Sequence, residues 1–296
     1  MRSDVGRVAS VSSLRKTVRF DALQAPLSDS ADRRIVFENA QYRAMLSEAI
    51  AAVLPPEGVL SYDVFDTFLL RDDVSEYRRF IEIAELVAAH VGCDPVDAFI
   101  ARHLGTRASY RAGRRVKGCG EGSLSEIHRT AARLLGCDEA AAETFVDIEL
   151  DYEADHLSVN PALMELARWH RERGGRVIAI SDMYMHAEQI ERLMARIVPG
   201  HPLFDVVYSS ADTKVSKASG HLFDLVREDL DARAIGCVHV GDSLYGDFRR
   251  ARERGWAALH LPVAAAEIAR RRHDHVMARD RLLQERQVAV EIKLPA

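Results

Sequence analysis

The sequence has few cysteines and no long apolar run, and each absence narrows the class of protein. The four cysteines among 296 residues form no Cys-x-x-Cys pair and no zinc-like spacing, so we expect reduced thiols and a cytoplasmic protein. No apolar stretch approaches the roughly 20 residues that a membrane helix needs. The basic N-terminus is not followed by the apolar segment of a secretory signal. We therefore expect no membrane partner.

A broad excess of positive charge is also absent. The 40 Lys and Arg residues are outnumbered by 45 Asp and Glu residues, which gives a formal net charge of −5. A general nucleic-acid binder depends on a wide basic surface, so we expect no nucleic-acid partner. Hydrophobic residues make up 48% of the chain and charged residues 29%, a composition typical of a soluble globular protein with a sizeable core.

The order of sequence patterns predicts an α/β protein, a parallel-sheet core that carries an inserted helical module. In the core, short apolar runs alternate with helical patterns, which indicates a parallel sheet with right-handed crossovers. Between the first two strands the chain carries four amphipathic helical patterns and no strand pattern. The predicted segments are a core domain over 58–72 and 158–263 and a helical cap domain over 73–157.

Both ends of the chain lie outside this core. Residues 1–33 are rich in Ser, Asp, Arg and Ala and predict a mobile leader. Residues 34–57 predict a helix packed on the core, and 264–296 a charged C-terminal helix and tail. Its Arg270-Arg271-Arg272-His273 run is typical of a solvated face. The terminal helices are candidates for homodimer formation or for docking to a partner.

Four polar stretches stand where the predicted strands end or a helix begins. The first, Asp63-Val64-Phe65-Asp66-Thr67, follows an apolar run, and the second, Ser181-Asp182, follows another. Lys217 precedes a predicted helix, and the fourth stretch, Gly241 to Asp247, again ends a strand in carboxylates. In open α/β sheets, ligands bind beyond the carboxyl ends of the strands. The sequence therefore predicts that these four stretches form one site.

In this order, the four stretches resemble the four motifs of the haloacid dehalogenase (HAD) superfamily, over roughly Val59 to Leu261. The resemblance implies a Rossmann-like sheet core with a helical cap of the C1 type. It also implies that Asp63 is a nucleophile that forms an aspartyl-phosphate and a ligand of Mg²⁺. The other implied metal ligands are the backbone carbonyl of Phe65 and the side chains of Asp242 and Asp247.

The same resemblance implies how the phosphoryl group is held. Ser181 would hydrogen-bond a phosphoryl oxygen, with Thr67 and Asp182 as further substrate-binding residues. A lysine would offset negative charge, as phosphoryl transfer requires. Lys217 is preferred over Lys214 for this role because it stands in a loop that opens a helix.

The first motif departs from the commonest pattern of the superfamily, which has a second aspartate two residues after the nucleophile as general acid. Phe65 occupies that position here. Asp66, one residue later, is either a displaced general acid or a turn residue. A non-acidic residue at this position is also found in haloacid dehalogenases and in phosphonatase-like enzymes. Phosphonatases add a cap lysine, for which Lys117 is the only candidate.

The predicted cap carries several arginines. Arg107, Arg111, Arg114 and Arg115 fall near one face of a helix, and they form either an anionic-substrate clamp or a solvated surface. The leading prediction is a Mg²⁺-dependent HAD phosphatase acting on a small phosphorylated metabolite. The alternatives are a C–halogen or C–P hydrolase and a catalytically weak HAD-fold binding protein.

Overall fold

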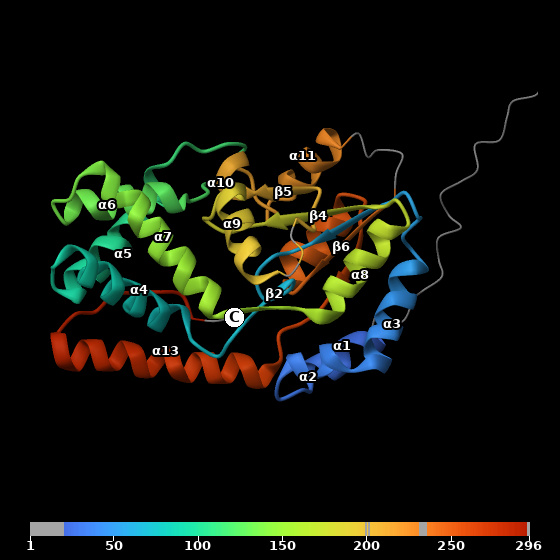
Figure 1. Cartoon of the computed structure of the whole chain (residues 1–296), viewed down its shortest axis with the longest axis horizontal. Coiled ribbons are helices and arrows are strands. Elements are labelled where there is room, and N and C mark those ends of the chain that lie inside the picture. Colours follow the sequence, from blue (N-terminus) through green and yellow to red (C-terminus); the bar gives the residue numbers. More distant parts are fainter. Residues whose placement is uncertain (1–20, 199, 201, 231–235, 295–296) are drawn as a thin grey trace, which may run out of the picture.

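The computed structural model describes residues 21–198, 200, 202–230 and 236–294. These residues form an elongated molecule of two parts, a sheet-containing core and a helical cap (Figure 1). The core holds one parallel sheet covered by helices on both faces. The predicted fold class, an α/β protein with a Rossmann-like parallel sheet and an inserted helical cap, is confirmed.

The core sheet has five parallel strands in the order β5-β4-β1-β6-β7. β1 is the central strand, and its last residue, Tyr62, is paired with Ala179 of β4 and Val240 of β6. Residues that follow these three strands therefore meet at one edge of the sheet. The strands are β1 Val59–Tyr62, β4 Arg176–Ser181, β5 Val206–Ser209, β6 Cys237–Gly241 and β7 Ala257–His260.

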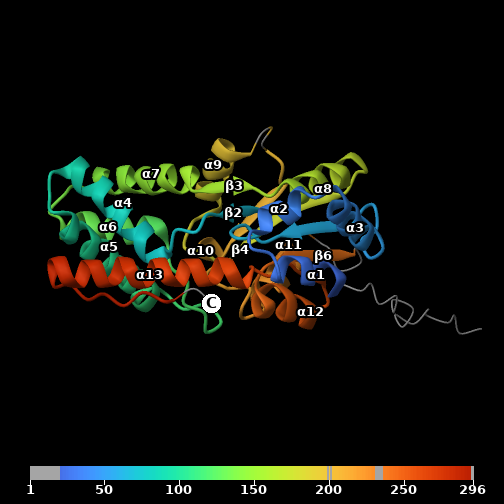
Figure 2. The same cartoon turned by 90° about the horizontal axis from the view of Figure 1, so that it is seen from below.

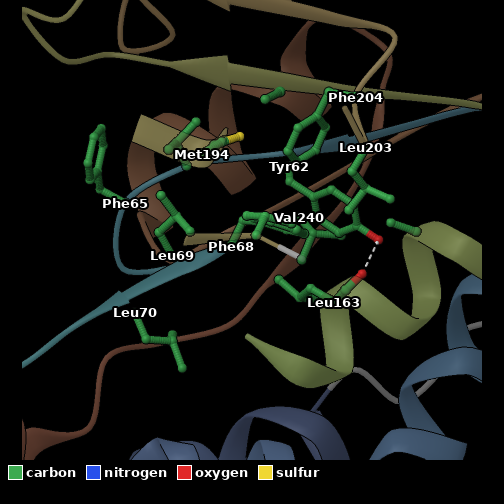
Figure 3. Packing of buried hydrophobic residues seen from close by; sticks show 14 of the residues in the cluster. Tyr62, Phe65, Phe68, Leu69, Leu70, Leu163, Met194, Leu203, Phe204 and Val240 are labelled. Atoms are coloured by element: carbon green, nitrogen blue, oxygen red, sulfur yellow. Dashed lines mark hydrogen bonds between the residues drawn. The ribbon is translucent and has the colours of Figure 1, made fainter. Parts of the chain in front are cut away.

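Side chains alternate between the two faces of each strand, so that each face is buried under its own helices. Tyr62 faces one cluster, where its ring lies 5.6 Å from that of Phe68 and its hydroxyl donates to the Leu163 carbonyl at 3.3 Å (Figure 3). Val59 faces the other cluster. The first face is covered by α3 Ala40–Ala51, α8 Pro161–Glu172 and α9 Ala187–Ile197, and the second by α11 His221–Asp229 and α12 Arg250–Glu253.

The cap consists of four helices inserted between β1 and β4. Each begins at a residue whose side chain accepts a hydrogen bond from the first turn, and these residues are Ser75, Asp94, Ser123 and Asp138. The helices are α4 Glu76–Val91, α5 Pro95–Ala112, α6 Leu124–Leu134 and α7 Glu139–Asp155. They lie side by side and bury an apolar cluster of their own.

A small antiparallel sheet, which was not predicted from the sequence, joins the cap to the core. β2 Leu69–Arg71 pairs with β3 Leu157–Val159. Strands of three residues are too short to show an alternating pattern in the sequence. They bring the two ends of the inserted module together, so the cap leaves and returns to the core at one place.

The prediction of a mobile leader over 1–33 is wrong for residues 21–33, and residues 1–20 lie outside the described residues. α1 Asp21–Ser28 buries Leu23 and Leu27, which are four residues apart and therefore share one helix face. The helix predicted within 34–57 is divided into α2 Arg33–Glu38 and α3. Asn39 causes the break, because its side chain accepts from the backbone N–H of Tyr42 and caps α3.

The C-terminal helix α13, Ala265–Arg286, runs along both parts of the molecule (Figures 1 and 2). It was expected to present the 270–273 run to solvent, which is wrong for Arg271. That side chain is buried and pairs with Asp66 in the core. Among the helices that the structure describes, none is long and apolar enough to cross a membrane.

Candidate active site

Lys217 and three aspartates form the centre of the site at the carboxyl ends of the strands. Asp63 follows β1, Asp242 follows β6, and Asp247 lies in the π-helical segment Leu244–Arg249. The Lys217 ammonium forms ion pairs with Asp63 and, at 2.6 Å, with Asp247. The structure thus brings together residues that lie up to 184 positions apart, as the distance from Asp63 to Asp247 along the sequence shows.

The structure places Lys217, and not Lys214, beside the nucleophile candidate. Lys214 ends the short helix α10 Ser210–Thr213 in the left-handed conformation, with φ of 57°. Lys217 is buried, and burial alone would lower its pKa. The Asp247, Asp63 and Asp182 carboxylates outweigh burial and raise the pKa above its ordinary value, so the side chain stays an ammonium ion.

The three aspartates differ in their electrostatic environments. Burial raises the pKa of Asp63 to about 6, against the opposing effect of Lys217. Burial also raises the pKa of Asp242 well above its usual range, and the Asp63 and Asp247 carboxylates add to the effect. For Asp247, Lys217 and His239 outweigh burial and hold the pKa below its usual range. One ammonium is thus shared by two carboxylates, and Asp242 has no cation partner among the described ion pairs.

This imbalance fits a divalent cation. Carboxylate oxygens of Asp63, Asp242 and Asp247 all lie within 4.8 Å of one another. Mg²⁺ prefers a small number of carboxylates and keeps several waters. The fit depends on the Asp242 carboxyl, which is partly buried and has no cation partner among the described ion pairs, because a charge withdrawn from water needs a partner. The resemblance also implies that the Phe65 carbonyl binds the metal, which stays a prediction.

The two hydroxyl groups predicted to bind the phosphoryl group lie at this edge of the sheet. Ser181 is the last residue of β4, and its buried hydroxyl has no hydrogen-bond partner among the residues that the structure describes. Buried polar groups in proteins are nearly always hydrogen-bonded, and a phosphoryl oxygen could accept a hydrogen bond from this hydroxyl. The Thr67 hydroxyl lies 3.3 Å from Asp63 and 3.4 Å from Asp242, at the limit of hydrogen bonding. It therefore links two of the carboxylates.

Asp182 was expected to bind substrate, but its carboxylate is occupied by the protein. It accepts the backbone N–H groups of Lys217, at 2.6 Å, and Ala218, at 3.1 Å. Burial raises its pKa, against the effects of Lys217. The structure places Asp182 as a group that shapes the lysine-bearing loop.

Asp66 stands outside the three-carboxylate cluster. Its carboxylate pairs with Arg271 at 2.9 Å, and with Arg33 and Arg71 at 3.6 Å. Burial would raise its pKa, but these three guanidinium groups outweigh burial and hold the pKa well below the usual range. Its φ of 57° is a left-handed turn that aspartate tolerates better than most residues. Asp66 therefore has the geometry of the turn residue rather than that of the displaced acid.

Phe65 places a ring where the superfamily commonly has its acid. The ring is buried and lies 4.5 Å below the Arg71 guanidinium, a cation–π contact. Lys117, the candidate cap lysine, is exposed in a turn with φ of 49°. The cap arginines 107, 111, 114 and 115 are likewise exposed, in agreement with the solvated surface rather than the clamp.

His239 and the arginines around Asp66 were not predicted from the sequence. His239 lies within β6, and its ring bridges the Asp247 carboxylate at 3.1 Å and the Ser61 hydroxyl at 2.8 Å. Its place in an otherwise apolar strand, two residues before Gly241, was a signal of a functional neighbour. Arg33 and Arg271 carried no such signal, because each stands in a charged segment typical of a surface.

Neither a protein-family model nor a curated protein matches the sequence. Solved structures do match. The HAD-hydrolase YfnB from Bacillus subtilis, bound to magnesium, has 13% identity and a TM-score of 0.42, over 74% of this chain and 99% of that one. A HAD phosphatase from Thermococcus onnurineus has 19% identity and a TM-score of 0.44, over 68% and 84%.

An L-2-haloacid dehalogenase from Xanthobacter autotrophicus, with chloropropionic acid covalently bound, has 16% identity and a TM-score of 0.42, over 72% of this chain and 81% of that one. The solved structures that this chain resembles thus include both HAD phosphatases and haloacid dehalogenases.

Proposed function

We propose that the chain is a hydrolase of the HAD superfamily and, more specifically, a Mg²⁺-dependent phosphatase of a small phosphorylated metabolite. The observation that supports it best is the partly buried Asp242 carboxyl, which lies beside the Lys217-paired Asp63 and has no cation partner among the described ion pairs. A carboxylate nucleophile, a fixed ammonium and a site for a hard cation are the parts that phosphoryl transfer needs.

In the proposed reaction, an Asp63 carboxylate oxygen attacks phosphorus and forms an aspartyl-phosphate. The bond from phosphorus to the leaving oxygen breaks, and its electron pair leaves with that oxygen. Ser181 donates a hydrogen bond to a phosphoryl oxygen, and Lys217 offsets the negative charge. Water then attacks phosphorus, which releases inorganic phosphate and regenerates Asp63. When bound, Mg²⁺ supplies further charge neutralisation to the phosphoryl oxygens.

Phe65 limits which esters the site can cleave. Because a ring stands where a general acid is common, the leaving oxygen departs without a proton from that position. We therefore expect a steep dependence on the leaving group, with aryl phosphates and acyl phosphates cleaved faster than alkyl phosphates. General acid catalysis is typically worth about 10²–10⁴-fold, which sets the size of the expected difference.

The test is hydrolysis of 4-nitrophenyl phosphate with Mg²⁺ and with a chelator. We expect activity that depends on Mg²⁺ and is lost in Asp63→Asn, which keeps the shape of the side chain but not its nucleophilicity. Asp280→Asn, an exposed site on α13, is the matched control and should retain wild-type activity. Absence of phosphate release from a panel of aryl and acyl phosphates would contradict the proposal.

A C–halogen hydrolase is the second candidate, and Phe65 is the observation that favours it. In that reaction an Asp63 oxygen displaces halide from carbon, and no metal is needed. Release of chloride from 2-chloropropionate in the presence of a chelator would establish it. The two further carboxylates of the cluster, Asp242 and Asp247, have no metal to bind in that chemistry, so phosphoryl transfer accounts for more of the site.

A further inference from the structure

A chain of three side chains joins the cap to the core beside the candidate active site. Ser123, the cap residue that precedes α6, has its hydroxyl 2.7 Å from Nε2 of His186. Nδ1 of His186 lies 2.5 Å from a carboxylate oxygen of Asp212, in α10 of the core. The other Asp212 oxygen accepts the backbone N–H of Ala187 at 2.8 Å. Asp212 thus holds His186 in place, and His186 holds Ser123.

This arrangement has the geometry of a Ser-His-Asp triad, but the serine is not presented to a substrate. Ser123 is only 1% exposed, and its hydroxyl also lies 3.3 Å from the backbone N–H of Glu126, which it accepts as the cap of α6. The hydroxyl is therefore engaged on both sides. The chain of hydrogen bonds therefore connects the cap to the core.

These hydrogen bonds hold the end of the cap segment 113–123, which lies against the loops that carry Ser181 and Lys217. The backbone N–H of Leu124 donates to the Tyr184 carbonyl at 2.6 Å, three residues after Ser181. Cys119 is buried in the core cluster with Val215, and its sulfur lies 3.8 Å from the Ser216 hydroxyl. Ser216 immediately precedes Lys217.

The same segment brings a carboxyl group close to the site. Glu121 stands between Gly120 and Gly122, and the hydroxyls of Ser210 and Ser216 lie against its carboxyl. Burial and the Asp182 carboxylate raise the pKa of Glu121. A displacement of segment 113–123 would therefore uncover both the Lys217 loop and the Ser181-Asp182 loop.

The opposite edge of the cap is held by α13, whose contacts do not depend on His186. Asp274 accepts the backbone N–H of Ser75 at 3.0 Å and pairs with Arg78 at 2.6 Å. Farther along α13, Ala278 and Leu282 are buried in the apolar cluster of the cap. Figure 1 shows α13 along one edge of the molecule and the loop between α5 and α6 along the other. These contacts of α13 thus hold their edge of the cap whether or not the hydrogen bonds of His186 are present.

We propose that His186 is a positioning residue, which through Ser123 and Asp212 keeps the cap segment 113–123 closed over the loops that carry Ser181 and Lys217. As regards catalysis, the inference rests on the proposed function. A closed segment excludes water and holds the substrate. When the hydrogen bonds between Ser123, His186 and Asp212 are lost, segment 113–123 moves away from the core while α13 keeps the cap attached.

The first test measures closure without using activity. Cys119 becomes accessible only when the segment moves, so its alkylation rate by iodoacetamide, followed by peptide mass spectrometry, reports opening. We expect His186→Ala to raise this rate about fivefold or more, the factor expected for one lost hydrogen bond. Cys237, buried in β6, is the internal reference and should stay slow. His273→Ala, on an exposed face of α13, is the control variant.

The second test separates positioning from folding and from the proposed chemistry. His186→Gln, which retains donor and acceptor groups, should restore slow alkylation, whereas Asp212→Asn should accelerate it. If the phosphatase proposal holds, His186→Ala should raise KM for an aryl phosphate more than it lowers kcat. Unchanged alkylation of Cys119 in His186→Ala would overturn the inference even in an active enzyme. Faster alkylation in a protein without phosphatase activity would retain the inference on closure and reject the proposed function.

Discussion

The carboxylate of Asp66 is surrounded by three arginines that come from three different places in the chain. Arg33 precedes it by 33 residues and is 1% exposed, Arg71 follows in β2, and Arg271 lies in α13. Arg33 also donates to the backbone carbonyl of Asp66 at 3.0 Å. These contacts hold the turn that follows the nucleophile, so Asp66 acts on the site through its backbone.

We predict that Asp66→Asn lowers the free energy of unfolding by about 3 kcal/mol, because it leaves buried guanidinium groups without their shared carboxylate. Urea unfolding measures this loss. Asp32→Asn, which removes a half-exposed pair with Arg34, is the control and should change stability by less than about 0.5 kcal/mol.

Activity of the same Asp66→Asn variant distinguishes the turn residue from the displaced acid. A turn residue affects all substrates alike, so the ratio of aryl to alkyl phosphate hydrolysis should stay the same. A general acid matters most for poor leaving groups. A selective loss of alkyl phosphate hydrolysis in Asp66→Asn would therefore return Asp66 to the role of acid.

At this scale the sequence predicted some residues and could not predict others, for a physical reason. Asp63, Ser181 and Asp242 each follow an apolar strand, and the strand pattern alone places them at one edge of the sheet. The surroundings of Asp66 depend on Arg271, 205 residues away. No local pattern contains that pairing, so the arginine was interpreted as part of a solvated face.

At the scale of elements, α13 is an amphipathic helix whose first turns contact the core and whose later turns contact the cap. Its first turns carry charged contacts to the core, including the pair between Glu267 and Arg33 at 3.1 Å. Its later turns bury Ala278 and Leu282 against the cap. A helix of 22 residues is about 33 Å long, enough to reach from one part of the molecule to the other.

We predict that Leu282→Ala lowers the free energy of unfolding by about 2 kcal/mol, through the lost burial and the cavity that remains. Its neighbour Leu283 is 47% exposed, so Leu283→Ala is a matched control with an expected change within about 0.5 kcal/mol. Urea unfolding of the two variants measures the difference. Equal stability of the two would mean that this end of α13 does not pack on the cap.

The existence and order of helices and strands were predicted where helical or strand periodicity extends over at least a full turn or four residues. α4 to α7 and the five core strands are of this kind. β2 and β3 have three residues each, and the break between α2 and α3 depends on the single side chain of Asn39. The two short strands are set by tertiary contacts, and the helix break is set by a single N-cap residue. Neither changes the hydrophobic periodicity of the surrounding sequence enough to be predicted.

At the scale of the whole molecule, a buried polar network lies where the cap meets the core. Glu149 of α7 forms a buried ion pair with Arg102 of α5 and a 2.8 Å hydrogen bond with His128 of α6. The Tyr184 hydroxyl, from the core loop after Ser181, donates to Glu149 at 3.0 Å. One carboxylate thus ties three cap helices to the loop that carries a candidate phosphate ligand.

Glu149 should therefore make the stability of the protein sensitive to acid. Burial would raise its pKa, but Arg102 and His128 outweigh burial and hold the pKa below its ordinary value of 4.5. Because the folded-state pKa is below the unfolded-state pKa, the contribution of Glu149 is complete above pH 4.5. It is lost as the pH falls from 4.5 toward the lowered folded-state pKa.

We predict that Glu149→Gln lowers the free energy of unfolding at pH 7 by about 3–5 kcal/mol, because it leaves Arg102 buried without a charge partner. The difference from the wild type should shrink as the pH is lowered below 4.5, since Glu149 of the unfolded wild-type chain then takes up a proton and the wild-type free energy of unfolding falls. Urea unfolding over a pH series measures both effects. Glu85→Gln, at an exposed position of α4, should show neither. A difference that stays constant across the series would mean that the charge of Glu149 does not stabilise the contact between cap and core.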